Sequence, residues 1–316
     1  MNEAEKIEYA KSFLQTRIDE EFHYPFQVSF ENGRFLFRFR NGKRECCARV
    51  RKTEQMLDCI CGEAETAKRR EVERIFEILR AAVQAQASTV LSDCSEYGKV
   101  KDELILRPLN YRYSKDRLKD VPHLRVGDIA LVLYAVIKRD GANYFTAKMH
   151  RSQMENWTVQ EREVLQRALV NTSFLYPPRL YSIEDLLSWD GKRHEDGRFM
   201  SEDASCRIRR GLRGYILTNT LEINGAIALF YPGVAKKIAE GLGERFYIAF
   251  TSIHEAQIHS AGMISSDVVE RSLRDTNRHC NAPDEVLTNR VYCYDPEKKS
   301  FGIIKNGEFL EVKKDE

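Results

Sequence analysis

Residues 26–50 read FQVSFENGRFLFRFRNGKRECCARV, and this stretch decides the fold of the N-terminal third. Apolar and polar side chains alternate along it, and Asn-Gly pairs at 32–33 and 41–42 divide it into three parts. Alternation with a period of two is typical of a strand buried on one face, and Asn-Gly between two such runs is the strongest short hairpin signal. The pattern therefore predicts a small antiparallel meander.

Segments with helical periodicity flank this meander. Residues 3–19 and about 65–86 repeat apolar side chains at spacings of three and four, which is the period of an amphipathic helix. Residues 56–61 are predicted to form a fourth strand. We expect a first domain of residues 1–95, built from a helix, the meander and a helix packed on one side of it.

The remainder of the chain mixes strands and helices and is expected to form a larger mixed α/β sheet domain of residues 96–316. A helix over 158–170 is predicted from Thr158 as N-cap and Glu161 three residues later as a capping box. Further strands are predicted within 100–113, 124–138, 144–149, 215–218, 226–231, 246–251, 290–294 and 301–304, and further helices over 232–242 and 266–279. This order argues for an α+β fold, with a glycine-rich loop or hinge at 189–214.

Composition excludes several classes of protein. The 316 residues carry 50 Lys and Arg against 48 Asp and Glu, a net charge of +2, which excludes a globally basic nucleic-acid coat protein and an acidic tail protein. A hydrophobic content of 42% excludes wholesale disorder. The longest apolar run, IALVLYAVI at 129–137, is shorter than the roughly 20 residues of a membrane-spanning helix. Because the first residues also lack a signal-peptide pattern, we expect a cytosolic protein with no membrane partner.

The eight cysteines are expected to be reduced thiols. They form no C-x-x-C pair, and a chain of this size does not need disulfides for its stability. The four cysteines between 46 and 61 would need an irregular backbone to share one ion, because neighbours on a strand point to opposite faces. We therefore expect neither a metal site nor a cofactor.

Two groups of arginines are the places where an acidic partner would be sought. The first consists of Arg34, Arg38 and Arg40, and the second, in a glycine-rich segment, of Arg207, Arg209, Arg210 and Arg213. Arginines near aromatic residues are typical of nucleic-acid surfaces, and clustered arginines bind phosphate. The simpler interpretation of the first group is the solvated face of a sheet, because its arginines lie opposite the phenylalanines. The simpler interpretation of the second group is a solvated loop.

A hydroxyl, an imidazole and a carboxylate follow one another at the end of a predicted strand, as Ser252, His254 and Glu255. Such groups together can perform nucleophilic or acid–base chemistry. A zinc-protease H-E-x-x-H motif is disfavoured, because His254 and His259 lie five residues apart rather than four. The alternative is a capped turn, in which the hydroxyls bond local backbone. The sequence leaves open both a hydrolase site and a structural turn.

Short blocks of residues occur in the same order as in a known bacterial family. They are 110–111, 122–123, 128–130, Trp157, Ala168, 171–172, 217–219, 224–226, 252–255, 285–289, 291–292 and 294–295. From about residue 98 to the end, the chain resembles the domain-of-unknown-function family 5688, found mainly in gut-dwelling anaerobic Firmicutes. Where that family usually has Pro-Ser-Ser, this chain has Phe250, Thr251 and Ser252, which keeps the second hydroxyl. The resemblance implies a bacterial setting and no particular activity, since the family has none assigned.

We expect an accessory protein of the bacterial cytosol that binds a protein or nucleic-acid partner, in a mobile-element or defence setting. That setting follows from the resemblance alone. The competing expectation is a hydrolase with its site at Ser252, His254 and Glu255. A pocket in which these three side chains converge would favour the enzyme, whereas side chains that cap the backbone would favour the binding protein.

Overall fold

The computed structural model describes residues 1–22, 26–31, 33–41, 44–87, 96–140, 143–184, 196–211, 213–305 and 308–312. Contacts between Cα atoms divide the chain into two compact units. Unit 1 comprises Met1–Ser92 with Ile137–Phe145, and unit 2 comprises Asp93–Val136 with Thr146–Glu316. Helices accompany antiparallel sheets, so the expected α+β fold class is confirmed.

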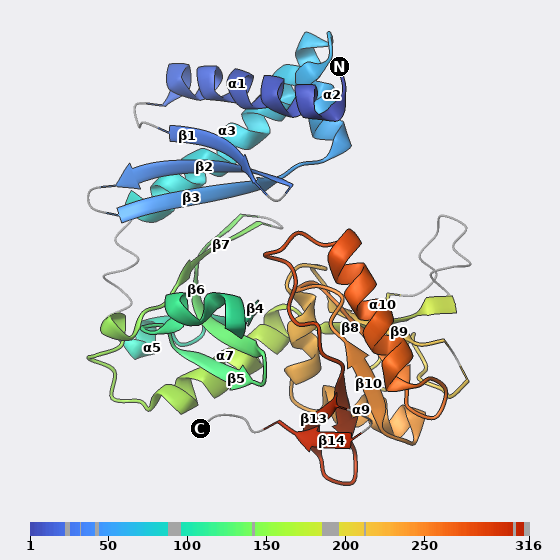
Figure 1. The fold of residues 1–316 in the computed structure, drawn as a ribbon. Helices are drawn as coiled ribbons and strands as arrows, with labels where there is room; N and C mark the ends of the chain where they lie inside the picture. Colours follow the sequence, from blue (N-terminus) through green and yellow to red (C-terminus); the bar gives the residue numbers. More distant parts are fainter. Residues whose placement is uncertain are drawn as a thin grey trace. The chain divides into compact units, whose positions relative to one another are not determined.

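Unit 1 is a three-stranded sheet covered by helices on one face. Its strands are β1 (Phe26–Glu31), β2 (Arg34–Asn41) and β3 (Arg44–Arg51), and its helices are α1 (Glu3–Glu21), α2 (Glu54–Cys61) and α3 (Glu65–Ala87). The strands pair in the order β1-β2-β3, and the helices lie on one side of them (Figure 1). Phe35, Phe37 and Phe39 of β2 are buried in the core that the helices share. The predicted meander is confirmed.

The predicted fourth strand at residues 56–61 is wrong, because these residues belong to helix α2. The Thr53 side chain accepts a hydrogen bond from the Met56 main-chain N–H at 3.0 Å and so caps the start of the helix. Met56, Leu57 and Ile60 are all buried, and their spacing of one and four residues fits one face of a helix. A short apolar run carries both strand and helix signals, and the threonine cap before it decides between them.

Unit 2 contains two antiparallel sheets. The smaller has the order β4-β6-β5, with β7 also paired to β6, and the larger has the order β14-β13-β12-β10-β11-β9-β8. The smaller sheet is built from β4 (Leu104–Asn110), β5 (His123–Val126), β6 (Ile129–Asp140) and β7 (Asn143–Lys148). The larger is built from β8 (Pro178–Ser182), β9 (Tyr215–Asn219), β10 (Phe246–Ala249), β11 (Ala256–Ser260), β12 (Tyr292–Asp295), β13 (Ser300–Lys305) and β14 (Glu308–Glu311).

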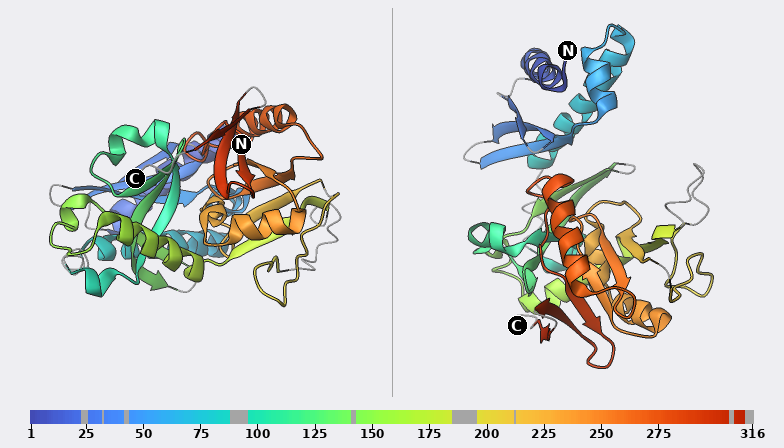
Figure 2. Two further views of the ribbon diagram at one scale, coloured as in Figure 1. Left: turned by 90° about the horizontal axis from the view of Figure 1, so that it is seen from below. Right: turned by 45° about the vertical axis from the view of Figure 1, so that its right-hand side comes forward.

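Helices cover both faces of the larger sheet. Phe246 and Ile248 of β10 point into the main core with helix α9 (Val234–Leu242), whereas Ala249 packs with helix α10 (Ser266–His279). Successive residues of a strand point to opposite faces, so α9 and α10 lie on opposite sides of the sheet (Figure 2). The other helical elements of unit 2 are α5 (Tyr97–Val100), α6 (Tyr111–Ser114), η1 (Lys115–Leu118), η2 (Arg151–Gln153), α7 (Glu161–Leu175) and η3 (Gly225–Phe230).

Two local predictions in unit 2 are wrong. Residues 226–231 are not a strand, since 225–230 form the 3-10 helix η3 after Asn224, whose φ of 54° lies in the left-handed region. The predicted capping box is also absent, because α7 begins at Glu161 with Gln160 as its N-cap and no side-chain cap hydrogen bond. The residues of η3 are buried as their apolar pattern indicates, but a short apolar run does not fix the backbone conformation. The helix predicted over 158–170 does form, and only its bounds and its cap differ.

The predicted loop at 189–214 has irregular backbone wherever the structure describes it, and it is anchored to the core of unit 2. Phe199 and Cys206 are 1% and 4% exposed, and the Leu180 main-chain N–H donates to the Gly197 carbonyl at 2.9 Å. Residues 189–195 and Leu212 lie outside the described part of the chain.

In the part of the chain that the structure describes, no helix combines the length and apolar character that crossing a membrane requires. Within the same residues, no group of three or more His, Cys, Asp or Glu side chains could hold a metal ion.

Candidate functional site

The turn between β10 and β11 carries the three residues predicted to form a hydrolase site. This turn is fixed to two other segments by its backbone. The Ile253 main-chain N–H donates to the Glu285 carbonyl at 2.9 Å, and the Ile253 carbonyl accepts from the Ala226 main-chain N–H at 3.3 Å. The turn therefore lies between η3 and the segment that precedes β12.

Ser252 is used by the turn itself. It is 8% exposed, and its Oγ accepts a hydrogen bond from the His254 main-chain N–H at 3.0 Å. This is the local side-chain-to-backbone bond by which serine stabilises turns. The serine hydroxyl therefore contacts the backbone of His254, whereas a catalytic pair would need contact with the imidazole ring.

The His254 imidazole is paired with Glu285. Its Nδ1 accepts a hydrogen bond from the Asn224 main-chain N–H at 3.1 Å, so the hydrogen of the neutral ring is on Nε2. Nε2 lies 3.4 Å from Oε1 of Glu285, and the two side chains are 25% and 13% exposed. The carboxylate accepts from this N–H and stabilises the ring in one tautomer and one orientation.

Glu255 is bonded to another residue of the same turn. Its Oε1 accepts a hydrogen bond from the Thr251 hydroxyl at 3.0 Å. Thr251 is 4% exposed, and its carbonyl accepts a hydrogen bond from the Asn281 side chain. The Thr251 hydroxyl thus has a defined partner within the turn.

The backbone around this turn is packed too closely for any side chain at Gly225. A Cβ there would lie 2.1 Å from Thr218 Oγ1 and 2.4 Å from the His254 carbonyl oxygen. Those two atoms are themselves joined by a hydrogen bond of 2.9 Å. The glycine therefore allows η3 to approach β9 and the turn, and it supports the position of Asn224 against the imidazole.

Ser252, His254 and Glu255 are neighbours in space but do not form a catalytic constellation. Each has a separate partner: the backbone for Ser252, Glu285 for His254 and Thr251 for Glu255. A hydrolase needs the nucleophile within hydrogen-bond reach of its base. These contacts instead match the capped-turn interpretation, with a histidine–carboxylate pair added to it.

Sequence reasoning missed Glu285 and Asn224 as partners of the histidine. Both belong to the blocks that resemble the family, at 285–289 and 224–226, and this is the signal that could have pointed to them. Their distance along the chain, 31 and 30 residues from His254, hides the contact from any pattern of local spacing.

The second arginine group does not behave as one site. The Arg210 guanidinium donates to the Gly243 carbonyl at 2.7 Å and to the Leu242 carbonyl, which are free acceptors at the C-terminal end of α9. A cation there also interacts favourably with the helix dipole. Arg209 contacts the Tyr215 hydroxyl through its main chain only, at 2.8 and 3.1 Å. The side chains of Arg207, Arg209 and Arg213 are exposed, which fits a solvated loop with one structural arginine.

Arg34 and Arg38 of the first arginine group lie on the face of the three-stranded sheet opposite the helices. Arg34 is directly opposite Arg51 on β3 and opposite Glu31 on β1. Arg38 donates to Ser29 Oγ at 2.6 Å and to Glu31 Oε1 at 2.7 Å. The side chain of Arg40 lies outside the described residues, and its backbone occupies the same strand.

A family model described as a family of unknown function (DUF5688) matches residues 58–296. The match covers more than half of the chain, so the chain belongs to this family, and the suspected resemblance is confirmed. No curated protein and no solved structure matches the chain.

Proposed function

We propose that this DUF5688 protein acts by binding a nucleic acid through the face of the β1-β2-β3 sheet that lies opposite the helices of unit 1. Of the partner classes expected from the sequence, a nucleic acid fits this face better than a protein does. The single observation that carries the proposal is the strand register, which places Arg34, Arg38 and Arg51 on that face.

The register follows from the pairing of the strands. Phe37 is opposite Val28 and Ala48, and all three are buried under the helices, so the alternate residues of each strand occupy the opposite face. Among the described side chains, that face holds Arg34, Arg38 and Arg51, with Glu31 as the acid. Three positive residues against one negative residue make this face basic, although the net charge of the whole chain is only +2.

The strand pairing brings like charges together on this face. Arg34 and Arg51 are directly opposite each other on neighbouring strands, and like charges in that position are destabilising. Glu31, which is opposite Arg34 on β1, accepts a hydrogen bond from Arg38 at 2.7 Å. A polyanion laid across the sheet would relieve this repulsion.

The spread of the charges favours a phosphate backbone over a single anion. Arg34 and Arg38 lie four residues apart on one strand, which is about 13 Å at strand spacing. The phenylalanines are buried on the other face, so base stacking is not available to them. We therefore expect contacts to phosphates, and binding that is independent of base sequence and strongly dependent on salt.

We further propose that the protein works in the bacterial cytosol as an accessory protein, in a mobile-element or defence setting. What supports this is the resemblance to a bacterial family. The contact of Ser252 with backbone, and not with the His254 ring, argues against the hydrolase alternative.

The test is fluorescence anisotropy of the full chain with labelled single- and double-stranded DNA and RNA of mixed sequence. We expect the protein to bind at about 50 mM salt with a dissociation constant in the range of 10⁻⁴–10⁻⁶ M, which is typical of non-specific binding. The affinity should fall steeply as the salt concentration rises. The variant R34Q/R38Q should weaken binding to all sequences alike and reduce the slope of log K against log salt by about 2, one for each phosphate contact.

Arg17 provides the matched control. It is an exposed arginine of α1, on the helical side of unit 1, where it pairs with Glu20 at 2.8 Å. R17Q removes one positive charge from the helical side and should leave binding unchanged. No binding at about 50 mM salt, or equal loss in R17Q and R34Q/R38Q, would overturn the proposal. Binding to an acidic peptide but to no nucleic acid would do the same.

A further inference from the structure

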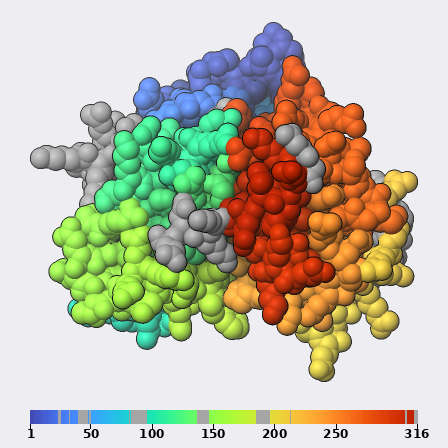
Figure 3. Space-filling view, turned by 60° about the horizontal axis from the view of Figure 1, so that its bottom comes forward, coloured from blue at the N-terminus to red at the C-terminus, as the bar shows by residue number. Residues whose placement is uncertain are grey.

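A buried aspartate in unit 2 organises a group of arginines that the proposed function does not use. Asp128 lies in the turn between β5 and β6, and its partners come from α6 and from the segment before β12. In the space-filling view, the C-terminal strands, coloured red, border green residues from earlier in unit 2 (Figure 3). The cluster thus joins parts of the chain that are more than 150 residues apart.

The backbone of Asp128 is fixed on both sides. Its N–H donates to the Tyr292 hydroxyl at 2.9 Å, and its carbonyl accepts from the Tyr111 N–H at 2.7 Å. The Tyr292 hydroxyl in turn donates to the Val126 carbonyl at 3.0 Å. Gly127 has a φ of 62°, and a Cβ there would lie 2.5 Å from the Tyr292 oxygen. The tight turn therefore holds the carboxylate in one place.

Two arginines approach the two oxygens of this carboxylate. Arg112 Nε donates to Oδ1 at 3.1 Å, and Arg290 Nε lies 3.2 Å from Oδ2. The aspartate side chain is 10% exposed, whereas those of Arg112 and Arg290 are 59% and 43% exposed. Because both arginines reach the carboxylate through Nε, the Nη1–Nη2 edge of each guanidinium is left for another acceptor. That edge carries two parallel N–H donors and can bind an oxoanion in bidentate fashion.

The local charge balance is positive. The Arg112 and Arg290 guanidinium groups share the single Asp128 carboxylate, which leaves an excess of one positive charge. The nearby Arg125 guanidinium is engaged elsewhere: it lies 4.2 Å from the centre of the Tyr111 ring and donates through Nε to the Gly127 carbonyl at 3.0 Å. A phosphate monoester carries a charge of about −1.5 to −2 at neutral pH and would neutralise this excess.

We propose that Arg112 and Arg290, held by Asp128, form a binding site for the dianionic phosphate group of a phosphate monoester. Asp128 acts as the positioning residue, since it orients both guanidinium groups without needing to touch the ligand. The phosphate oxygens accept from the outer edges of the two arginines. This site lies in unit 2 and is independent of the nucleic-acid surface proposed for unit 1.

The experiment is isothermal titration of the full chain with inorganic phosphate at constant ionic strength. We expect weak binding, with a dissociation constant on the order of 1 mM. R112Q and R290Q should each weaken phosphate binding about tenfold, and R112K should weaken it less, because lysine keeps the charge and loses the fork. Adenosine 5′-monophosphate and glycerol 3-phosphate, titrated in parallel, distinguish a nucleotide from another phosphate monoester as the source of the group.

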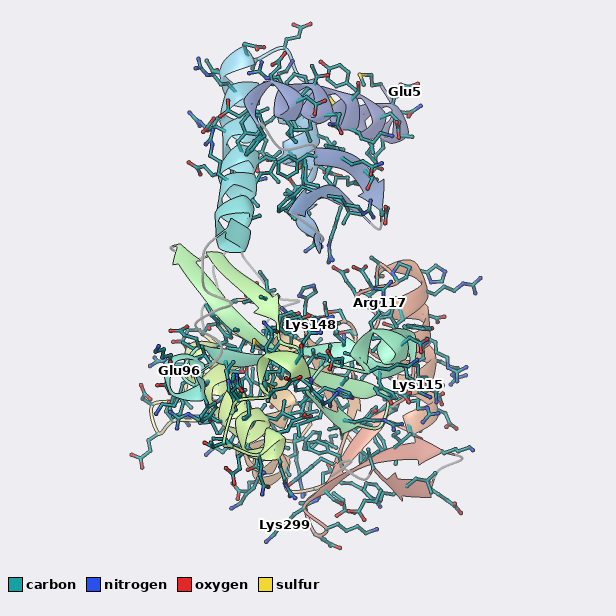
Figure 4. All side chains as sticks on the ribbon, turned by 90° about the vertical axis from the view of Figure 1, so that its left-hand side faces the viewer. Glu5, Glu96, Lys115, Arg117, Lys148 and Lys299 are labelled. Carbon is teal, nitrogen blue, oxygen red and sulfur yellow. The ribbon has the colours of Figure 1, made fainter. Side chains whose placement is uncertain are left out.

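Arg117 gives the matched control, because it is an exposed arginine on η1 close to Arg112 in sequence (Figure 4). R117Q should bind phosphate as the wild type does. Absence of binding to every phosphate probe, equal binding of acetate, or an equal loss in R117Q would overturn the proposal. If R290Q does not fold, R112Q decides the question alone, since Arg112 lies on the surface. R34Q/R38Q should leave phosphate binding unchanged, because these arginines belong to unit 1. The phosphate proposal and the nucleic-acid proposal can therefore fail independently of each other.

Discussion

Replacing Gly225 by alanine is expected to destabilise unit 2 strongly. The added Cβ would meet Thr218 Oγ1 at 2.1 Å, the His254 carbonyl oxygen at 2.4 Å and the Asn219 main-chain nitrogen at 2.9 Å, all well inside normal contact distance. Two of these atoms belong to the backbone, so a side-chain rotation cannot relieve the overlap. The chain must move η3 away from β9 and from the turn.

The magnitude follows from what that movement costs. Overpacking a well-packed region costs about 1–3 kcal/mol. The hydrogen bond from Thr218 Oγ1 to the His254 carbonyl, 2.9 Å long, would also be lost, at a further cost of about 1 kcal/mol. We therefore expect Gly225→Ala to lower the free energy of unfolding of unit 2 by about 3 kcal/mol.

The assay is urea denaturation followed by tryptophan fluorescence. Both tryptophans of the chain, Trp157 and Trp189, belong to unit 2, so the signal reports that unit alone. With a slope near 2 kcal/mol/M, the loss corresponds to a lower midpoint by on the order of 1 M. Gly98→Ala is the control, because a Cβ at Gly98 meets nothing within 4 Å. A midpoint for Gly225→Ala within the range of that control would refute the close packing around the turn.

Three further outcomes are expected. Tyr292→Phe should lower the free energy of unfolding by about 2–4 kcal/mol, because it leaves the buried Asp128 N–H and Val126 carbonyl without their partner. The control Tyr113→Phe, at a residue that is 72% exposed, should leave the free energy of unfolding unchanged. Equal urea midpoints for the two variants would contradict this prediction. Burial raises the pKa of the Cys293 thiol to about 12, so the contribution of this thiol to stability is complete below pH 9 and declines as the pH rises towards 12. The difference in free energy of unfolding between wild type and Cys293→Ala should therefore narrow between pH 9 and 12. A constant difference would contradict the prediction. Burial lowers the pKa of His259, so this histidine is protonated more readily in the unfolded chain, and the free energy of unfolding should fall as the pH drops below 6.5. His259→Gln should make the urea midpoint depend less on pH between about pH 7 and 5.

The local elements were predictable where one signal dominated. In unit 1, the alternation of phenylalanine and arginine along β2 set both the strand and the buried face, because the helices can cover only one side of the sheet. Helix α9 was equally clear, since Gly243 ends it in the left-handed region with a φ of 67°. Predictions failed at residues 56–61 and 226–231, where a short apolar run is compatible with a strand, an α-helix or a 3-10 helix.

The contacts of the candidate site were harder to predict from the sequence than the local elements. Local spacing singled out Ser252, His254 and Glu255, but the partner of the histidine is Glu285, and the ring is oriented by the Asn224 backbone. Glycine at 225 is required because of atoms contributed by Thr218 and by the turn, and no local pattern contains that information.

Periodicity and residue order along the chain are enough to specify the α+β class, the family and the basic face of the small sheet. Which charges meet depends on how the chain folds. The arginines at 112 and 290 are unremarkable in the sequence, and they gain a common role because Asp128 is buried between them. A carboxylate removed from water is stable only when cations compensate it, and folding alone brings those cations from opposite ends of unit 2.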